Sequence, residues 1–288
     1  MKPKSILLLI VIISILACAT GCGGSSEFDT EQSINVISRE DGSGTRGAFT
    51  DIFGLILQGE GGTRKDISTK EAVIAKQTDV LMASITNDKY AIGYISMGSL
   101  NDTVKAVAID GIMPSAATVG SEEYSVVRPF WIFTKENPSE LCVDFIDFVT
   151  SADGQAVVSQ NYIESFRDAA EYSGNKPSGK IVVAGSSSVT PIMEKLKEAY
   201  IGVNPGAKIE IQQSDSSAGF TGTVEGTCDI GMASRDLTED EQVQVNSVKI
   251  ALDGIVIVVN KNNSVDNLSK QQVKEIFTGE ITKWSELS

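Results

Sequence analysis

The segment KIVVAGSSSVTPIMEKL (residues 180–196) contains a strand, a loop of small residues and a helix in direct succession. Its first part, Ile181–Ala184, is β-branched and apolar, which is typical of a buried strand. Gly185-Ser186-Ser187-Ser188 forms the loop, and Val189–Tyr200 has the apolar spacing of a helix. A strand that runs through a short loop into a helix indicates an α/β unit.

A second segment, INVISREDGSGTRGAF (residues 34–49), repeats this design near the other end of the chain. It predicts a strand at Ile34–Ser38, a loop at Asp41–Thr45 and a helix over Thr45–Leu57. The remaining pattern predicts strands at 91–96, 104–109, 126–134, 207–212 and 228–233, a long apolar run at 249–260, helices over 139–160 and 269–277, and a polar linker at 167–180. We therefore expect α/β lobes with largely parallel sheets, and the length suits two domains.

The first 21 residues have the pattern of a signal peptide. Two lysines precede the apolar run Ile6–Ala17, which is shorter than the ~20 residues of a spanning helix. Small residues precede Cys22, and a flexible Gly-Gly-Ser-Ser sequence follows it, as in bacterial lipoprotein signals. We expect cleavage before Cys22, a tether over residues 22–33, and a lipid on Cys22 that anchors the chain to the outer face of the cell membrane. Cys18 is the other candidate for the lipid, and a plain secreted protein that is cut nearby and carries no lipid is the alternative.

Composition narrows the classes of function. The formal net charge of −14 argues against binding to nucleic acid or to anionic lipid. The sequence has no histidine, which excludes Ser-His-Asp and Cys-His nucleophile systems and HExxH zinc sites, although catalysis by Asp and Glu alone stays open. Beyond Cys22 only Cys142 and Cys228 remain, and we expect two free, buried thiols. No metal and no cofactor are expected.

Both loops of the repeated design are candidate anion sites, because the start of a helix presents unpaired N–H groups and the positive end of its dipole. Either loop taken alone could simply be a helix cap. The first loop also matches the dinucleotide-binding pattern G-x-G-x-x-G at Gly42, Gly44 and Gly47. That interpretation requires an acid after a second strand, whereas no predicted strand precedes Asp66.

Two further loops follow or begin strands in the second half of the chain. Ser214–Gly219 comes directly after the strand KIEIQQ, and Asp229 opens the otherwise apolar strand Cys228–Ala233. For Asp229 the alternative is a surface aspartate at the start of a strand.

Six segments together resemble the phosphate-binding receptors of bacterial ABC-type phosphate importers. They are VAGSSSVTPIMEKL, IQQSDSSAGF, TCDIGMASRDL, ALDGIVIVVN, IFTGEITKWSEL and ISREDGSGTRGAF, and the agreement extends over nearly all of residues 34–288. The resemblance implies a two-lobed periplasmic-binding-protein fold of type II, with a hinge and a ligand cleft between the lobes. It also implies extracytoplasmic capture of inorganic phosphate and delivery to ABC permease subunits, without catalysis. Receptors for sulfate or molybdate, and a surface phosphate sensor or adhesin, are the alternatives.

Carried over to this sequence, the resemblance implies a phosphate site of hydroxyls, backbone amides, one cation and one carboxylate. Asp41 would orient Arg39, the cation. Asp229 would accept the hydrogen that phosphate carries and sulfate lacks, and would thereby exclude sulfate. The implied ligand-binding residues are Ser187, Ser188, the Val189 amide, Ser216 and Asp229 on one lobe, and Arg39, Ser43, the Gly44 amide and Thr45 on the other.

The order of the segments departs from the family. There the GSSSV segment comes first and WSEL runs on into INVISRE, whereas here INVISRE comes first. We interpret this as a circular permutation, with a truncated gene or a fragment of a tandem arrangement as the alternative. One lobe would then be 109–255 and the other 34–108 plus 256–288, with hinge strands near Val107–Ile109 and Ile255–Val259.

Overall fold

The computed structural model describes residues 28–59 and 63–287. The predicted signal peptide, Cys22, Cys18 and most of the tether lie outside these residues. Within the described ranges, none of the helices combines the length and the apolar character needed to cross a bilayer. Cys142 and Cys228 are both free and buried, as expected.

The first part of the chain alternates strands and helices. Its elements are β1 (Asn35–Arg39), α2 (Gly44–Ile52), β2 (Ile56–Gln58), β3 (Arg64–Asp66), β4 (Val73–Ala75), α3 (Thr78–Asn87), β5 (Ala91–Ser96), the 3₁₀ turn η2 (Met97–Ser99), β6 (Lys105–Ile109) and α4 (Ala116–Gly120).

The rest of the chain begins with a long strand and ends in a 3₁₀ turn. Its elements are β7 (Val127–Thr134), α5 (Glu140–Thr150), α6 (Ala152–Val158), β8 (Ile163–Glu164), β9 (Gly179–Ser186), α7 (Thr190–Val203), β10 (Ala207–Ser214), α8 (Ser216–Glu225), β11 (Ile230–Ala233), α9 (Glu239–Gln242), β12 (Asn246–Val259), β13 (Asn267–Leu268), α10 (Lys270–Thr278) and η3 (Trp284–Leu287).

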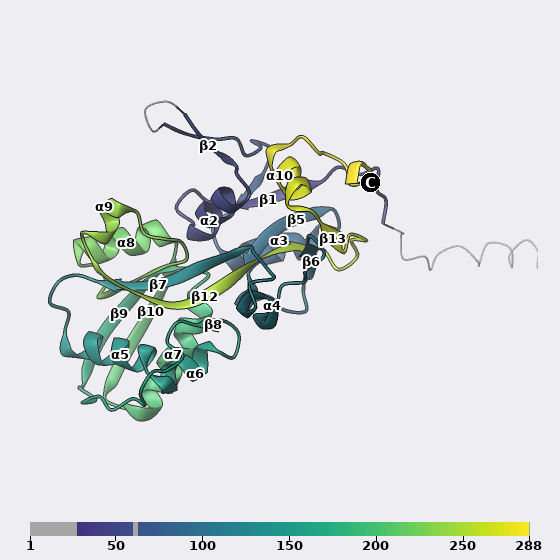
Figure 1. Ribbon diagram of the computed structural model, residues 1–288. Coiled ribbons are helices and arrows are strands. Elements are labelled where there is room, and N and C mark those ends of the chain that lie inside the picture. The colour runs from purple at the N-terminus through teal and green to yellow at the C-terminus, as the bar shows by residue number, and fades with distance from the viewer. Residues whose placement is uncertain (1–27, 60–62, 288) are drawn as a thin grey trace, which may run out of the picture.

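Strand β12 joins the two halves of the molecule. The main sheet of the described residues runs in the order β10-β9-β11-β7-β12-β5-β1-β4. β12 pairs antiparallel with β7 as far as Gly254, and from Ile255 onward it pairs with β5. Figure 1 shows β7 and β12 running side by side into the lower half, while β12 continues into the upper half. The predicted α/β class is confirmed.

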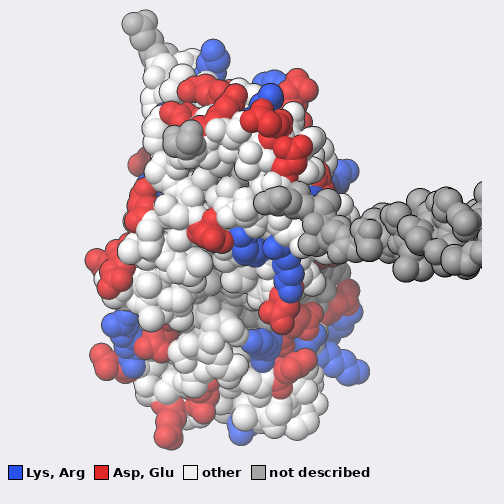
Figure 2. All heavy atoms as spheres, turned by 90° about the vertical axis from the view of Figure 1, so that its right-hand side faces the viewer, with Lys and Arg blue, Asp and Glu red and all other residues white. Residues whose placement is uncertain are grey.

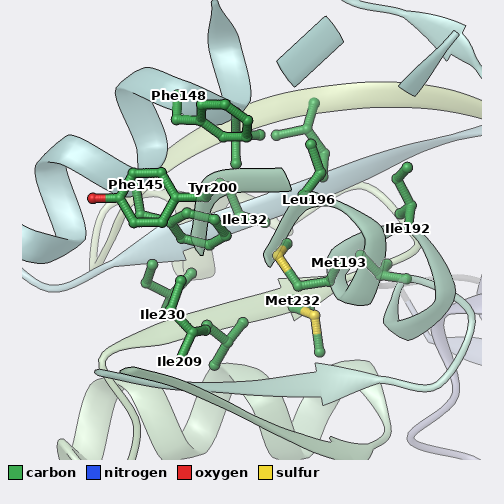
Figure 3. Packing of buried hydrophobic residues seen from close by; sticks show 14 of the residues in the cluster. Ile132, Phe145, Phe148, Ile192, Met193, Leu196, Tyr200, Ile209, Ile230 and Met232 are labelled. Atoms are coloured by element: carbon green, nitrogen blue, oxygen red, sulfur yellow. The ribbon is translucent and has the colours of Figure 1, made fainter. Parts of the chain in front are cut away.

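Each half has its own hydrophobic core. In the lower half, α5, α6 and α7 pack on the sheet through aromatic and aliphatic side chains, including Phe145, Phe148 and Tyr200. Figure 3 shows these rings facing residues of α7 and of the sheet strands. In the upper half, Phe49 of α2 and Phe277 of α10 share a core with strand residues. Both halves are therefore layered α/β units with helices packed on their sheets.

Residues 256–287 pack with the beginning of the described chain. Val259 and Trp284 lie in the core that contains Ile34. The Ile34 amide donates to the Thr282 carbonyl at 2.8 Å, and the Ser285 amide donates to the carbonyl of Thr30 at 2.8 Å. The two ends of the described chain are thus neighbours in the upper half.

The first crossing between halves lies later than the sequence suggests. Val119, Tyr124 and Val126 still belong to the upper core. The chain enters the lower half only at β7, so the crossing predicted near Val107–Ile109 is displaced to Val126–Val127. The reason is that β6 pairs with the last residues of β12, which belong to the upper half. Helix α4 then packs against β12 before β7 begins.

The predicted strands recur within a few residues, and the helical region 139–160 is broken as expected. Helix α2, however, ends at Ile52, since Gly54 adopts a φ of +64° that stops the helix. Residues 169–178 have no regular structure, as the predicted linker requires, although Tyr172 fixes them to the lower core by donating to Asp144.

Candidate functional site

Four helices begin at the seam between the two halves, each after a strand that ends there. They are α2 after β1, α3 after β4, α7 after β9 and α8 after β10. These strands pair in parallel, β1 with β4 and β9 with β10, so their carboxyl ends share an edge. Ligands of open α/β sheets bind at such edges, and helix N-termini attract anions.

Hydroxyl groups from the two halves meet between these helix starts. Thr45 of α2 and Ser188, just before α7, approach to 2.7 Å between hydroxyl oxygens. Thr78, the first residue of α3, lies 3.2 Å from the Ser187 hydroxyl. All four side chains are buried. We call these residues, with Arg39, Ser43, Ser216 and Ser234, the seam cluster.

Arg39 is the cation of the seam cluster, and its side chain is only 2% exposed. Its guanidinium donates across the seam to the Ser187 hydroxyl at 3.1 Å and within its own half to Thr78 at 3.2 Å. The Arg39 amide donates to the buried Tyr94 hydroxyl at 3.1 Å, which fixes the end of β1. Burial raises the pKa of Tyr94, so this hydroxyl stays protonated.

The partner that orients Arg39 is Glu40, and the expectation for Asp41 is wrong. Both carboxylate oxygens of Glu40 accept from the Arg39 guanidinium, at 2.8 and 2.7 Å. The Asp41 side chain is 98% exposed and pairs with Arg46 instead. Asp41 lies in the turn after β1 and faces solvent, whereas the longer Glu40 side chain folds back onto its neighbour.

Asp229 lies at the wrong end of its strand for the role expected of it. It precedes β11, where its carboxylate is exposed and accepts from the Val182 amide at 2.7 Å. The seam cluster lies at the carboxyl end of β11, at Ser234. The four residues of β11 lie between the two positions, and five steps along an extended chain span about 16 Å. Asp229 is therefore not a ligand of this site.

Ser234 takes the place at the seam that Asp229 was expected to occupy. Its amide donates to the Ser216 hydroxyl at 3.2 Å, and its hydroxyl accepts from Ser186 at 2.9 Å. The sequence signal for Ser234 is the small polar residue that directly follows the apolar strand Ile230–Ala233, because ligands gather at the carboxyl ends of parallel strands.

Thr78 is a further residue of the seam cluster that the sequence did not predict. Neither β4 nor α3 was predicted, since β4 has three residues and two of them are exposed. The signal that remained was a threonine after the short run Ala72–Ala75, in the same strand, polar residue and helix order as the other loops.

The backbone amides at the starts of these helices differ in whether they already donate to another group of the protein. The Val189 amide, expected to contact the ligand, donates to the Ser186 carbonyl at 3.0 Å. The Ser43 hydroxyl caps α2 by accepting from the Arg46 amide. Helix geometry leaves the Gly44 and Thr45 amides without an intrahelical acceptor, so these two can serve an anion.

A buried ion pair lies behind the seam cluster. Arg128 of β7 donates to Asp253 of β12 at 3.1 and 3.2 Å, and both side chains are at most 1% exposed. Asp253 also accepts from Ser96 of β5 in the upper half, at 3.0 Å. Arg128 donates further to the Ser234 carbonyl at 3.3 Å. Burial raises the pKa of Asp253 to about 6, against the opposing effect of Arg128.

Two hollows lie near the seam between the halves. One, of about 380 Å³, has Thr78 and Ser187 on its wall together with Pro191 and Leu100. The other, of about 330 Å³, lies between Gly47 of α2 and Arg235 beyond β11. The residues of the seam cluster are buried, and open space adjoins them at Thr78 and Ser187. A small ion held there would be largely shielded from water.

The arrangement is chemically suited to a small oxyanion. It combines four helix N-termini, one guanidinium and several hydroxyls in a buried place, where charge-assisted hydrogen bonds are strongest. In the described part of the chain, no group of three or more Cys, Asp or Glu residues could hold a metal ion.

Gly44 allows the two halves to close. A β-carbon at this position would lie 2.3 Å from the Ser216 hydroxyl oxygen and 2.8 Å from that of Ser234. We therefore expect Gly44→Ala to weaken anion binding about 5- to 150-fold, since it overpacks the closed form by about 1–3 kcal/mol. Gly47→Ala is the matched control, because its β-carbon would meet only Arg235, at 3.6 Å. Equal affinities of both variants in titration calorimetry would contradict the close contact.

Comparison with known proteins identifies relatives over the whole chain. The model of the PBP superfamily domain matches residues 26–153 and 170–288. The phosphate-binding protein PstS 2 of Streptococcus agalactiae serotype V is 46% identical over 292 residues, covering 100% of both chains. A crystal structure of the phosphate-binding protein of a phosphate ABC transporter from Streptococcus pneumoniae TIGR4 is 44% identical, with a TM-score of 0.69, and covers 89% of this chain and 100% of that one. The PstS of Staphylococcus haemolyticus is 38% identical over 112 residues, which is 36% of this chain and 35% of that relative.

Proposed function

We propose that this chain, which belongs to the PstS family of phosphate-binding proteins, captures inorganic phosphate outside the cytoplasm and delivers it to the permease of an ABC-type phosphate importer. The observation that carries the proposal is the seam cluster, where four helix N-termini and the buried Arg39 converge on hydroxyls from both halves. An anion at the seam would contact both halves at once, so its binding favours their closure.

The proposed role is binding without catalysis. The chain has no histidine to act as a general base. Glu40, a carboxylate in direct contact with the seam cluster, is held by Arg39 through both oxygens. A serine there would need a base to become a nucleophile, and Arg39 cannot accept a proton.

Phosphate binding is tested by titration calorimetry of the purified chain. We expect saturable binding of one phosphate per chain. High salt should lower the affinity only in part, because buried charges are screened less than exposed ones. Absence of phosphate binding by the folded chain near neutral pH would contradict the proposal.

We further propose that a lipid on Cys22 anchors the chain to the outer face of the membrane. The support is the sequence alone, in which small residues precede Cys22 and a flexible Gly-Gly-Ser-Ser sequence follows it. Labelling with a fatty-acid probe tests the anchor. Label that persists in Cys22→Ala and disappears in Cys18→Ala would move the site to Cys18.

We also propose that the chain is circularly permuted relative to family members that begin with the GSSSV segment. The closeness of Thr30 and Ser285 supports this, because joining the described ends needs only a short connection. The Staphylococcus relative aligns over only 112 residues, as a collinear alignment of permuted chains would. A rejoined chain that begins at Gly179 should fold and bind phosphate, and one that stays unfolded would count against the permutation.

A further inference from the structure

We propose that the turn η2 limits how far the two halves close, because Gly98 of this turn meets the buried ring of Tyr162 in the lower half. Gly98 and Tyr162 are then positioning residues, which act on the ligand only through the angle between the halves. The proposal rests on the proposed function, since it concerns the closure that a bound phosphate favours.

The turn η2 belongs to the upper half and faces the lower half. It follows β5 directly, and Met97 packs against the upper cores. Gly98 and Ser99 line the hollow of about 380 Å³ that Ser187 and Pro191 of the lower half also line. The turn is therefore a part of the upper half that comes close to the lower half when the seam is shut.

The hinge passes beside this turn. The two strands that connect the halves change from one half to the other at 126–127, where β7 begins, and at 254–255 in β12. A β-carbon at Gly254 would lie 3.5 Å from the Met97 side chain. Hinge motion is absorbed by backbone rotation at a few residues, so rotation at these positions changes the distance between η2 and the side chains of the lower half.

Tyr162 is the side chain of the lower half that η2 meets. It belongs to the lower core, where its ring centroid lies 5.4 Å from that of Phe130, and it is only 2% exposed. A β-carbon added at Gly98 would lie 1.9 Å from the Tyr162 hydroxyl oxygen and 2.0 Å from the ring carbon that carries it. A ring in a close-packed core yields little, so further closure would press it against the backbone of η2.

The buried ion pair behind the seam cluster holds η2 against this ring. Asp253 accepts from the hydroxyl of Ser96, the residue directly before the turn, at 3.0 Å. Burial raises the pKa of Asp253 to about 6, and a hydrogen bond from the Gly98 amide is among the opposing effects. Because Asp253 is itself fixed by Arg128, the turn is a rigid contact at the closed angle.

A substitution at Gly98 acts on closure without changing the ligand site itself. The three atoms nearest to an added β-carbon all belong to Tyr162, and none belongs to the seam cluster. The contact at Gly44 is different, because there the nearest atoms are those of Ser216 and Ser234. An effect of Gly98 on phosphate would therefore arise from the angle between the halves.

Gly98→Ala in the full chain is the first test. The methyl group would meet Tyr162 before the halves reach the closed angle, so we expect phosphate to bind about 5- to 150-fold more weakly. The loss should lie mainly in faster dissociation, because phosphate enters the seam while the halves are apart. Gly120→Ala is the matched control, since its β-carbon would lie 3.4 Å from Ile163. We expect its phosphate affinity to stay within threefold of the wild type.

Tyr162→Leu supplies the rescue, because leucine keeps an apolar side chain in the lower core and lacks the atoms that the methyl group would meet. In the Tyr162→Leu background, Gly98→Ala should lower phosphate affinity less than threefold, which a double-mutant cycle by titration calorimetry measures. In chemical denaturation without phosphate, Gly98→Ala should unfold at the same denaturant concentration as Gly120→Ala, because the open form has room for the methyl group.

Three results would overturn the proposal. The first is an unchanged phosphate dissociation rate in Gly98→Ala. The second is an affinity loss that persists in full beside Tyr162→Leu. The third is a Gly98→Ala chain that is unfolded, or much less stable than Gly120→Ala, without phosphate, because the contact would then exist at every angle of the hinge. A wild-type chain that folds and binds no phosphate overturns the proposed function instead.

Discussion

Replacing Arg39 by alanine is expected to weaken phosphate binding by about 2–5 kcal/mol, a loss of roughly 30-fold to several thousand-fold. Arg39 is the buried cation of the seam cluster and reaches Ser187 across the seam. Its removal leaves the half-buried Glu40 without its partner, so a carboxylate then faces the anion. Both effects act against binding, and titration calorimetry measures their sum.

Two comparisons separate this effect from a loss of fold. Arg39→Lys keeps the charge but not the forked donors, and it should retain part of the affinity. Arg39→Ala with Glu40→Ala removes both charges and should recover some binding relative to the single variant. A loss below tenfold in Arg39→Ala, with unchanged thermal unfolding, would show that Arg39 lies outside the site.

Replacing Asp253 by alanine is expected to lower the free energy of unfolding by about 3–5 kcal/mol, because it leaves Arg128 charged and unpaired in the interior. The pair links both halves, since Asp253 accepts from Ser96 above and Arg128 below. Arg128 of the pair also donates to the Ser234 carbonyl, so the pair supports the seam cluster.

The double variant Arg128→Met with Asp253→Leu is the matched control, measured like the single variant by chemical denaturation. Replacing a whole buried pair by apolar residues is often neutral for stability. We expect it to recover most of the lost unfolding free energy and to lower phosphate affinity, because the Ser234 carbonyl has lost the Arg128 donor. Unchanged phosphate affinity in the double variant would limit the pair to a structural role.

Acidic residues outnumber basic ones, 38 to 24, and Figure 2 shows Asp and Glu spread over the visible face with Lys and Arg among them. This surface charge has little effect on an anion at the seam. Exposed charges are screened within about 8–10 Å at ordinary salt, whereas the helix N-termini and Arg39 act at contact distance in a buried place.

The loops at the two quoted segments could be predicted from the sequence because a strand, small residues and a helix start follow each other directly. The two loops accordingly meet at the seam, through Arg39, Thr45, Ser187 and Ser188. The prediction for Asp229 failed because the sequence does not show which end of β11 lies at the seam. An apolar strand with polar residues at both ends does not itself say which end faces the ligand, and only the parallel pairing of β11 with β9 decides for Ser234.

Other differences arise from side-chain reach and from short elements. Whether Glu40 or Asp41 holds Arg39 depends on the turn after β1, which the sequence does not specify. The position of Thr78 follows from β4, the strand that precedes it. This strand is too short and too exposed for its sequence pattern to predict it. The crossing at Val126–Val127 depends on α4 packing into the upper core.

The capture of an anion at the seam is tested most directly by a crystal structure of the chain grown with phosphate. We expect a tetrahedral ion enclosed between the halves, with oxygens within hydrogen-bond distance of the Arg39 guanidinium, the Gly44 or Thr45 amide and the Ser188 hydroxyl. Asp229 should lie about 16 Å away, at the other end of β11. An ion bound elsewhere, or one that contacts a single half while Arg39 keeps its bonds to Thr78 and Ser187, would contradict the account.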